Sequence, residues 1–105
     1  MTELSLAEFL GLSGALLGIG LFGILTRRNF ILLLIAVEIA INSAILNFVY
    51  FAAYAGTTGG LSAQSAAVVI TGLAATEVAV GLAIVLALNR QRGSINVGEA
   101  TQLKL

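Results

Sequence analysis

The chain has 105 residues, of which 59% are hydrophobic and 10% charged, with a mean hydropathy of +1.07 and no net charge. These values exclude an ordinary soluble domain and indicate an integral membrane protein, and without a large basic cluster the chain is not expected to bind nucleic acid. Because the sequence contains no Cys, His or Asp, it also excludes an iron–sulfur cluster, a His-ligated haem and an ordinary zinc site.

Three apolar stretches are long enough to cross a bilayer, which takes about 20 helical residues. They are continuous, whereas the strands of a membrane barrel alternate in polarity. Without proline, each span is expected to be one unbroken helix. The sequence therefore predicts an all-α membrane protein with one domain, 1–105, whose three transmembrane helices cover about 6–26, 29–54 and 62–88, with a short polar C-terminal tail at 89–105.

The first predicted span is rich in glycine and carries no charge in its interior. Small residues let helices approach closely in a membrane, and Gly14 and Gly18 form the small-xxx-small pattern typical of such contacts. We expect this helix to be a packing surface. Glu8, near its start, is expected to lie at the membrane interface.

The arginines occur at only two places, which lie on the same side of a three-span protein. Arg27 and Arg28 separate the first two spans, and Arg90 and Arg92 follow the third. Basic residues favour the cytoplasmic side, or the matrix or stroma side in an organelle. The sequence thus predicts an N-terminus outside, on the periplasmic or luminal side, and a cytoplasmic C-terminus.

The second and third spans each carry one carboxylate in an aliphatic setting. Glu38 lies in "LLLIAVEIAINSAIL", about 14 Å from the helix end at Asn29. Glu77 lies in "TGLAATEVAVGLAIV", about 17 Å from the end at Leu88. In a hydrocarbon layer about 30 Å thick, both therefore fall near the midplane at similar depth.

A charge at that depth costs roughly 2.5 to 3.5 kcal/mol even on lenient insertion scales, which favours a functional role for the pair. Asn42, one turn after Glu38, could hydrogen-bond its carboxyl or a water. Small residues, Ala74 and Gly81, flank Glu77 on its helix face and would admit another helix. The residues thus favour proton or cation movement, completed by partner subunits. A structural pairing of the carboxyls with donors on neighbouring helices is the alternative.

Three segments carry a resemblance to a known family over nearly the whole chain, the first two more specifically than the third. "LFGILTRRNFILLLIAVEIAINSAILNFV" resembles its pattern of paired arginines, Asn, an aliphatic run, Glu and a later Asn, and "ITGLAATEVAVGLAIVLALNR" resembles its second signature. The tail "SINVGEATQLKL" is similar in a less specific way. The family is the small three-helix K subunit, subunit 4L in mitochondria, of respiratory complex I (NADH:quinone oxidoreductase), with photosynthetic and archaeal relatives.

This resemblance implies a membrane subunit that couples quinone reduction to proton translocation. It implies that Glu38 and Glu77 belong to a path of protonatable groups, and that Arg27 and Arg28 lie in a cytoplasmic loop involved in coupling. It also implies A-, J- and N-type subunits as partners in an energy-transducing membrane, with FMN, iron–sulfur clusters and quinone bound by other subunits and no cofactor on this chain.

Two other families with small membrane subunits remain alternatives. The C-type subunit of multisubunit sodium/proton antiporters shares the three-helix plan but lacks this pair of intramembrane Glu. Small homodimeric cation exporters use one membrane Glu, usually with four spans and aromatic residues near the site. A subunit that serves only packing or assembly is a third possibility.

Overall fold

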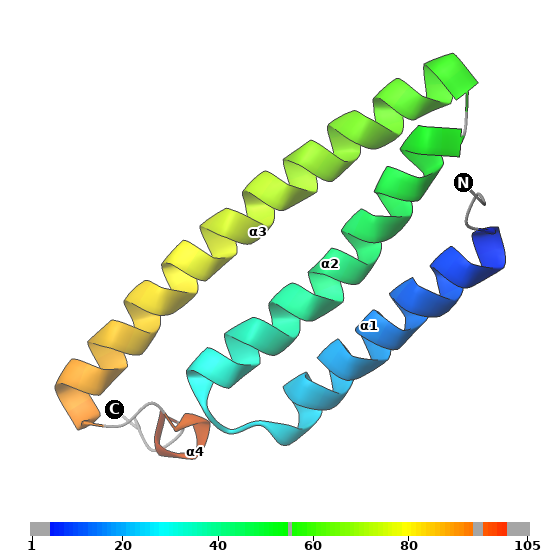
Figure 1. Cartoon of the computed structure of the whole chain (residues 1–105). Coiled ribbons are helices and arrows are strands. Elements are labelled where there is room, and N and C mark those ends of the chain that lie inside the picture. The colour runs from blue at the N-terminus through cyan, green and yellow to red at the C-terminus, as the bar shows by residue number, and fades with distance from the viewer. Residues whose placement is uncertain (1–4, 55, 94–95, 101–105) are drawn as a thin grey trace.

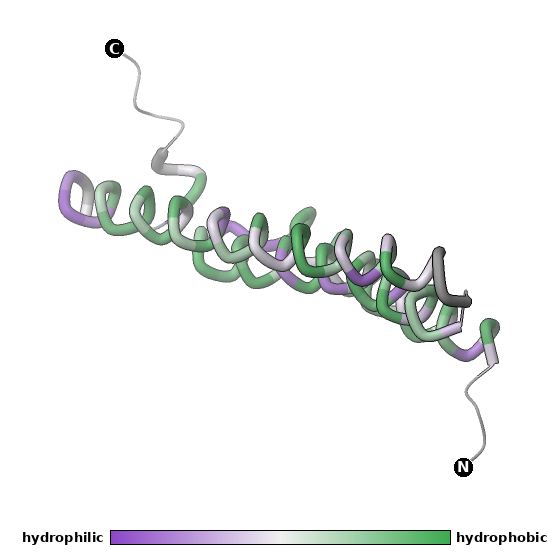
Figure 2. Tube along the Cα trace, turned by 90° about the horizontal axis from the view of Figure 1, so that it is seen from above, coloured by the Kyte–Doolittle hydropathy of each residue, from purple (hydrophilic) through white to green (hydrophobic). Residues whose placement is uncertain are grey.

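The computed structural model is built of α-helices (Figure 1). It describes residues 5–54, 56–93 and 96–100. Three long helices are followed by one short helix, in the order α1 (Leu6–Thr26), α2 (Phe30–Tyr54), α3 (Gly56–Arg92) and α4 (Val97–Ala100). All three long helices are long and apolar enough to cross a membrane, which confirms the three membrane-length helices of the predicted fold. Figure 2 shows hydrophobic residues along most of their length and hydrophilic residues at the end of α3.

The third helix is longer at both ends than the sequence suggested. It begins at Gly56, where a Gly/Thr-rich loop was expected up to residue 61, and it continues to Arg92. Helix packing explains the early start, because a Cβ on Gly60 would lie 2.7 Å from the Ala52 carbonyl oxygen of α2. Tertiary contact of this kind overrides the low helix propensity of glycine. Of the expected polar tail, residues 94–95 and 101–105 lie outside the described residues.

Helix α2 lies between the other two long helices. It packs against α1 on one side and α3 on the other, and the three run antiparallel to their neighbours in one layer (Figure 1). The molecule is elongated, with extents of 54 × 23 × 23 Å. The rotation of α2 about its axis is therefore fixed by α1, by α3 and by the connections at the two ends of α2.

The contact between α1 and α2 uses two glycines of the expected packing surface, but not the pair in the small-xxx-small pattern. A Cβ on Gly20 would lie 2.8 Å from the Ala40 backbone nitrogen, and one on Gly23 would lie 2.7 Å from the Ala36 Cβ. At Gly14 and Gly18 a Cβ would meet nothing within 4 Å. The small-xxx-small pair therefore does not form the intrachain contact, and the next glycines along α1 do.

The contact between α3 and α2 follows a seven-residue repeat of small residues on α3, namely Gly60, Ala67, Ala74 and Gly81. The first three are buried, and Gly81 lies directly against the Leu34 side chain of α2. A seven-residue period keeps one stripe of a helix facing its neighbour through a shallow left-handed crossing. This stripe positions α3, and the carboxylate it carries, against α2.

Side-chain caps begin both α1 and α2. The Ser5 hydroxyl accepts a bond from the Glu8 backbone N–H at 3.3 Å, and the Glu8 carboxylate accepts one from the Ser5 N–H at 2.8 Å. This capping box gives Glu8 a structural role that the sequence analysis missed, although Ser followed three residues later by Glu is its signature. Asn29 caps α2 by accepting from the N–H groups of Ile31 and Leu32 at 2.9 and 3.4 Å.

Six hydroxyl side chains of the long helices are satisfied by their own helices. Each of these donates to a backbone carbonyl three or four residues earlier, at 2.6 to 3.2 Å, and they are Ser13, Thr26, Ser43, Ser65, Thr71 and Thr76. In hydrocarbon, where water cannot serve as partner, such bonds let a hydroxyl be buried or face lipid. These side chains therefore need nothing from a neighbouring subunit.

Gly20→Ala is expected to weaken the packing of α1 on α2 by about 1–3 kcal/mol, the usual cost of overpacking, because the new methyl meets backbone atoms that cannot rotate away. The measurement is thermal unfolding of the chain purified in detergent. Gly18→Ala, which adds the same methyl in open space, is the matched control. Equal stability of the two variants would contradict this packing.

Candidate functional site

The two membrane carboxylates lie at the same depth on neighbouring helices. The reference point is the contact of Leu34 on α2 with Gly81 on α3. Glu38 lies one turn after Leu34, and Glu77 lies one turn before Gly81. Because α2 and α3 are antiparallel, these two steps lead in the same direction along the bundle.

Glu38 and Glu77 nevertheless lie on opposite sides of the α2–α3 contact. The shallow groove around Glu77 and the groove lined by Val37 share Gly81 and Ile84, so Glu77 lies on the Val37 side. Successive residues of a helix are rotated by about 100° about its axis. Seen along α2, Val37 and Glu38 therefore point to opposite sides of the direction in which Leu34 points, so Glu38 lies on the other side of the contact. The two carboxyl groups do not face each other across the helix pair.

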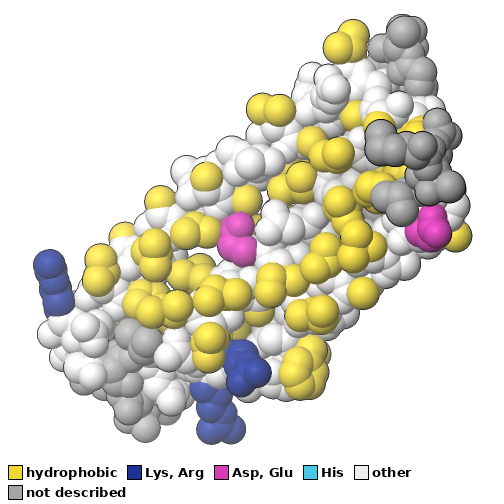
Figure 3. All heavy atoms as spheres, viewed as in Figure 1, with side chains coloured by type: hydrophobic (Ala, Val, Ile, Leu, Met, Phe, Trp, Pro, Cys, Tyr) yellow, Lys and Arg dark blue, Asp and Glu magenta, His cyan; other side chains and the backbone are white. Residues whose placement is uncertain are grey.

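Neither carboxylate has a partner within the part of the chain that the structure describes. Glu38 is half-buried and Glu77 is exposed on α3, and neither makes a hydrogen bond or ion pair there. Asn42 is exposed one turn from Glu38 and makes no bond to its carboxyl among those residues. Figure 3 shows an acidic side chain midway along the molecule among hydrophobic groups. The carboxylates thus differ from the hydroxyls, which are satisfied by their own helices.

The surroundings of Glu77 are those of a membrane-facing or subunit-facing surface. Its groove on α3 is lined by Leu73, Thr76, Val80 and Ile84, with Gly81 at the edge toward α2. A carboxyl group exposed on such a surface cannot remain in contact with lipid at low cost. Chemically, the arrangement offers two groups that can take up and release a proton, each open to a partner helix or to water.

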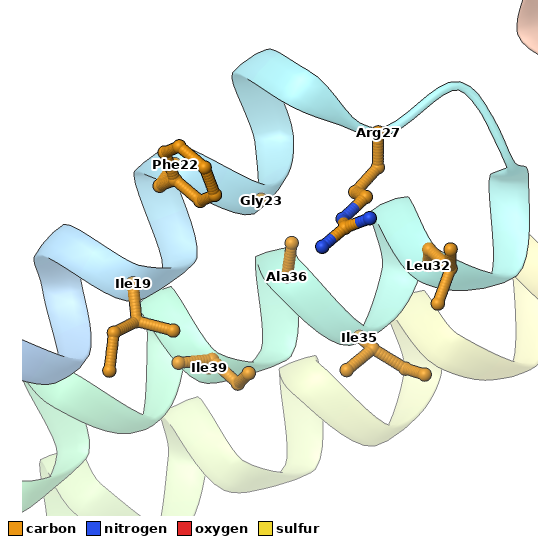
Figure 4. Close-up of a pocket in the computed structure, with 8 residues that line it drawn as sticks. All are labelled: Ile19, Phe22, Gly23, Arg27, Leu32, Ile35, Ala36 and Ile39. Atoms are coloured by element: carbon orange, nitrogen blue, oxygen red, sulfur yellow. The ribbon is translucent and has the colours of Figure 1, made fainter.

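The described arginine side chains gather at one end of the molecule (Figure 3). Arg27 and Arg28 are exposed in the α1–α2 connection, and Arg90 is exposed near the end of α3. The side chain of Arg27 extends over a hollow of about 180 Å³ between α1 and α2, where Phe22, Leu32 and Ile35 form apolar walls (Figure 4). The Arg28 carbonyl oxygen accepts a hydrogen bond from the Val97 N–H at 2.7 Å.

The pairing of the C-terminal segment with the arginine-bearing connection is a feature that the sequence analysis missed. Asn29 forms an isolated antiparallel bridge with Asn96. The sequence gives only a weak signal for it, because an Asn before an apolar run indicates a helix cap and does not indicate what pairs with it.

Comparison with known proteins places the chain in a family. The family described as NADH-ubiquinone/plastoquinone oxidoreductase chain 4L matches residues 8–105. Similar curated proteins, each named NADH-quinone oxidoreductase subunit K, include one from Anaeromyxobacter sp. (strain K), 44% identical over 90% of this chain and 93% of its own. The protein of that name from Deinococcus radiodurans is 43% identical over 91% and 90%. The one from Geobacillus sp. is 39% identical over 99% of both chains. The chain therefore belongs to the NADH-ubiquinone/plastoquinone oxidoreductase chain 4L family.

Proposed function

We propose that this chain is the K-type membrane subunit of a proton-pumping NADH:quinone oxidoreductase, or of a relative with another electron donor. In this proposal Glu38 and Glu77 pass charge between quinone reduction and proton translocation. The observation that carries it is the pair of carboxylates at one depth that make no intrachain bond in the described residues of a family member. The membrane is an energy-transducing one.

The proposed orientation places the arginine-rich end in the cytoplasm or its organellar equivalent, with the N-terminus on the opposite side. Arg27, Arg28 and Arg90 at one end support it, since basic residues are retained on the cytoplasmic side. Glu38 and Glu77 are then reached from that side through about half of the hydrocarbon layer.

The α2–α3 pair needs a partner subunit or a water-filled space on each of its two sides. Because Glu38 and Glu77 lie on opposite sides of it, two different neighbours or water-filled spaces must receive them. We propose A-, J- and N-type subunits for these positions. FMN, iron–sulfur clusters and quinone belong to other subunits in this proposal, and the chain has no independent catalytic activity.

The mechanism follows from the placement of the two groups. Quinone reduction elsewhere changes the field or hydration around Glu38, and its proton occupancy changes. Since Glu77 does not face it, the charge passes through water or a partner's side chain around the α2–α3 contact.

Glu38→Gln is expected to lower proton pumping coupled to quinone reduction by roughly tenfold or more, since a proton-transferring group typically contributes about 10²- to 10⁴-fold. Glu77→Gln should have a comparable or milder effect. The measurement is pumping and quinone reduction by the assembled complex in membrane vesicles. Wild-type rates for Glu38→Gln would refute its role.

The same two variants test whether the carboxylates serve only packing. Neither group makes an intrachain bond in the described residues, so Glu38→Gln and Glu77→Gln should assemble at the wild-type level. The content of this subunit in the purified complex, relative to its neighbours, measures this. Loss of the subunit from both variants would favour the structural alternative.

The orientation can be tested with single cysteines, because the chain has none. Gly59→Cys should react with a membrane-impermeant maleimide in intact cells, and Gln91→Cys should react only in inverted vesicles. Both positions are exposed at opposite ends of α3. The reverse labelling pattern would overturn the proposed orientation.

A further inference from the structure

After α3 the chain reverses and returns to the α1–α2 connection. Gly93 has a φ of +67°, which favours glycine, and its N–H donates to the Asn89 carbonyl oxygen at 2.8 Å, ending the helix in a left-handed cap. Asn96 then pairs with Asn29, and the Val97 N–H bonds the Arg28 carbonyl oxygen at 2.7 Å. Figure 1 shows α4 beside this connection, at the end where α3 stops.

The returning segment contacts the residues that start α2. Asn29 is the cap of α2, because its side-chain oxygen accepts from Ile31 and Leu32. Asn96 is itself fixed, since its side-chain oxygen accepts from the Gly98 N–H at 2.8 Å. The pairing of Asn96 with Asn29 therefore ties the turn at the start of α4 to the turn at the start of α2.

This tie links parts of the fold that the helix packing leaves separate. Helices α1 and α3 both pack on α2, on different sides of it. At the arginine-rich end, Asn96 and Val97, which follow α3 closely in the sequence, pair with Asn29 and Arg28 in the connection between α1 and α2. It therefore restrains the rotation of α2 about its own axis, and this rotation decides which side of the α2–α3 contact Glu38 occupies.

We propose that Asn96 and Val97 are positioning residues, which strap the Arg28–Asn29 backbone in place and thereby hold Glu38 in its working orientation. The effect on pumping rests on the function proposed above for Glu38, whereas the strap itself is tested separately. The strap stays docked throughout turnover.

Val97→Pro removes the N–H that bonds Arg28 and changes little else. Val97 is the first residue of α4, a position that suits proline. Asn96 before it is paired in a β-bridge, and the residue before a proline favours such an extended conformation. Val97→Ala keeps the N–H and is the matched control. Both variants are measured in the assembled complex.

The expected result has two parts. Hydrogen exchange at Ile31 and Leu32 should rise by roughly two- to tenfold in Val97→Pro, the effect of one net hydrogen bond, and not in Val97→Ala. Protons pumped per quinone reduced should fall in Val97→Pro alone. Unchanged exchange or unchanged pumping in Val97→Pro overturns the proposal, whereas wild-type pumping in Glu38→Gln would refute the proposed function instead.

A disulfide provides a covalent rescue of the lost bond. The bond from Val97 to Arg28 makes Asn29 and Asn96 a non-hydrogen-bonded pair, a type whose Cα atoms lie about 4.5 Å apart, within reach of a disulfide. Asn29→Cys and Asn96→Cys combined with Val97→Pro should pump better when oxidised than when the same preparation is reduced. With Val97 retained, oxidation should leave pumping unchanged. Loss of pumping on oxidation in the variant that keeps Val97 would overturn the proposal that the strap stays docked throughout turnover.

Discussion

The absence of hydrogen-bond partners in the hydrocarbon layer is the constraint on which the rest of this structure depends. It forces the backbone into helices, and it divides the polar side chains of the spans into two groups. Hydroxyls such as Thr71 and Thr76 bond to carbonyls of their own helix. The carboxylates of Glu38 and Glu77 make no such bond in the described residues. What the chain does not satisfy internally marks where it needs water or other subunits.

Because the helices form a single layer, the places where the chain needs water or other subunits lie on two opposite sides of it. With α2 in the middle, the α2–α3 pair has two open flanks, and one carboxylate lies on each. Such a chain can connect two neighbours at one depth in the membrane without enclosing a channel of its own. The small-residue stripe on α3 and the glycines of α1 bring the backbones close, so that the rotation of α2, and thus the position of Glu38, is set by backbone contacts.

The matched depth of Glu38 and Glu77 could be predicted from the sequence because it depends on local geometry alone. A fixed rise per residue sets how far each of them lies from the end of its helix. The glycines of α1 that contact α2 could not be predicted in this way. Glycine spacing marks several possible faces of α1, and only the contact with α2 selects Gly20 and Gly23. The start of α3 at Gly56 likewise depends on packing with Ala52, which composition does not reveal.

The sequence by itself determined three membrane-spanning helices, two carboxylates at matched depth, arginines clustered at two points and a family resemblance that the comparisons confirmed. Only the tertiary structure decided that α2 is central, that Glu38 and Glu77 point to opposite flanks, and that Asn96 pairs with Asn29. The physical reason is that hydrophobicity and spacing act along one helix. The rotation of each helix and the pairing of distant backbone groups depend on contacts between segments far apart in the chain.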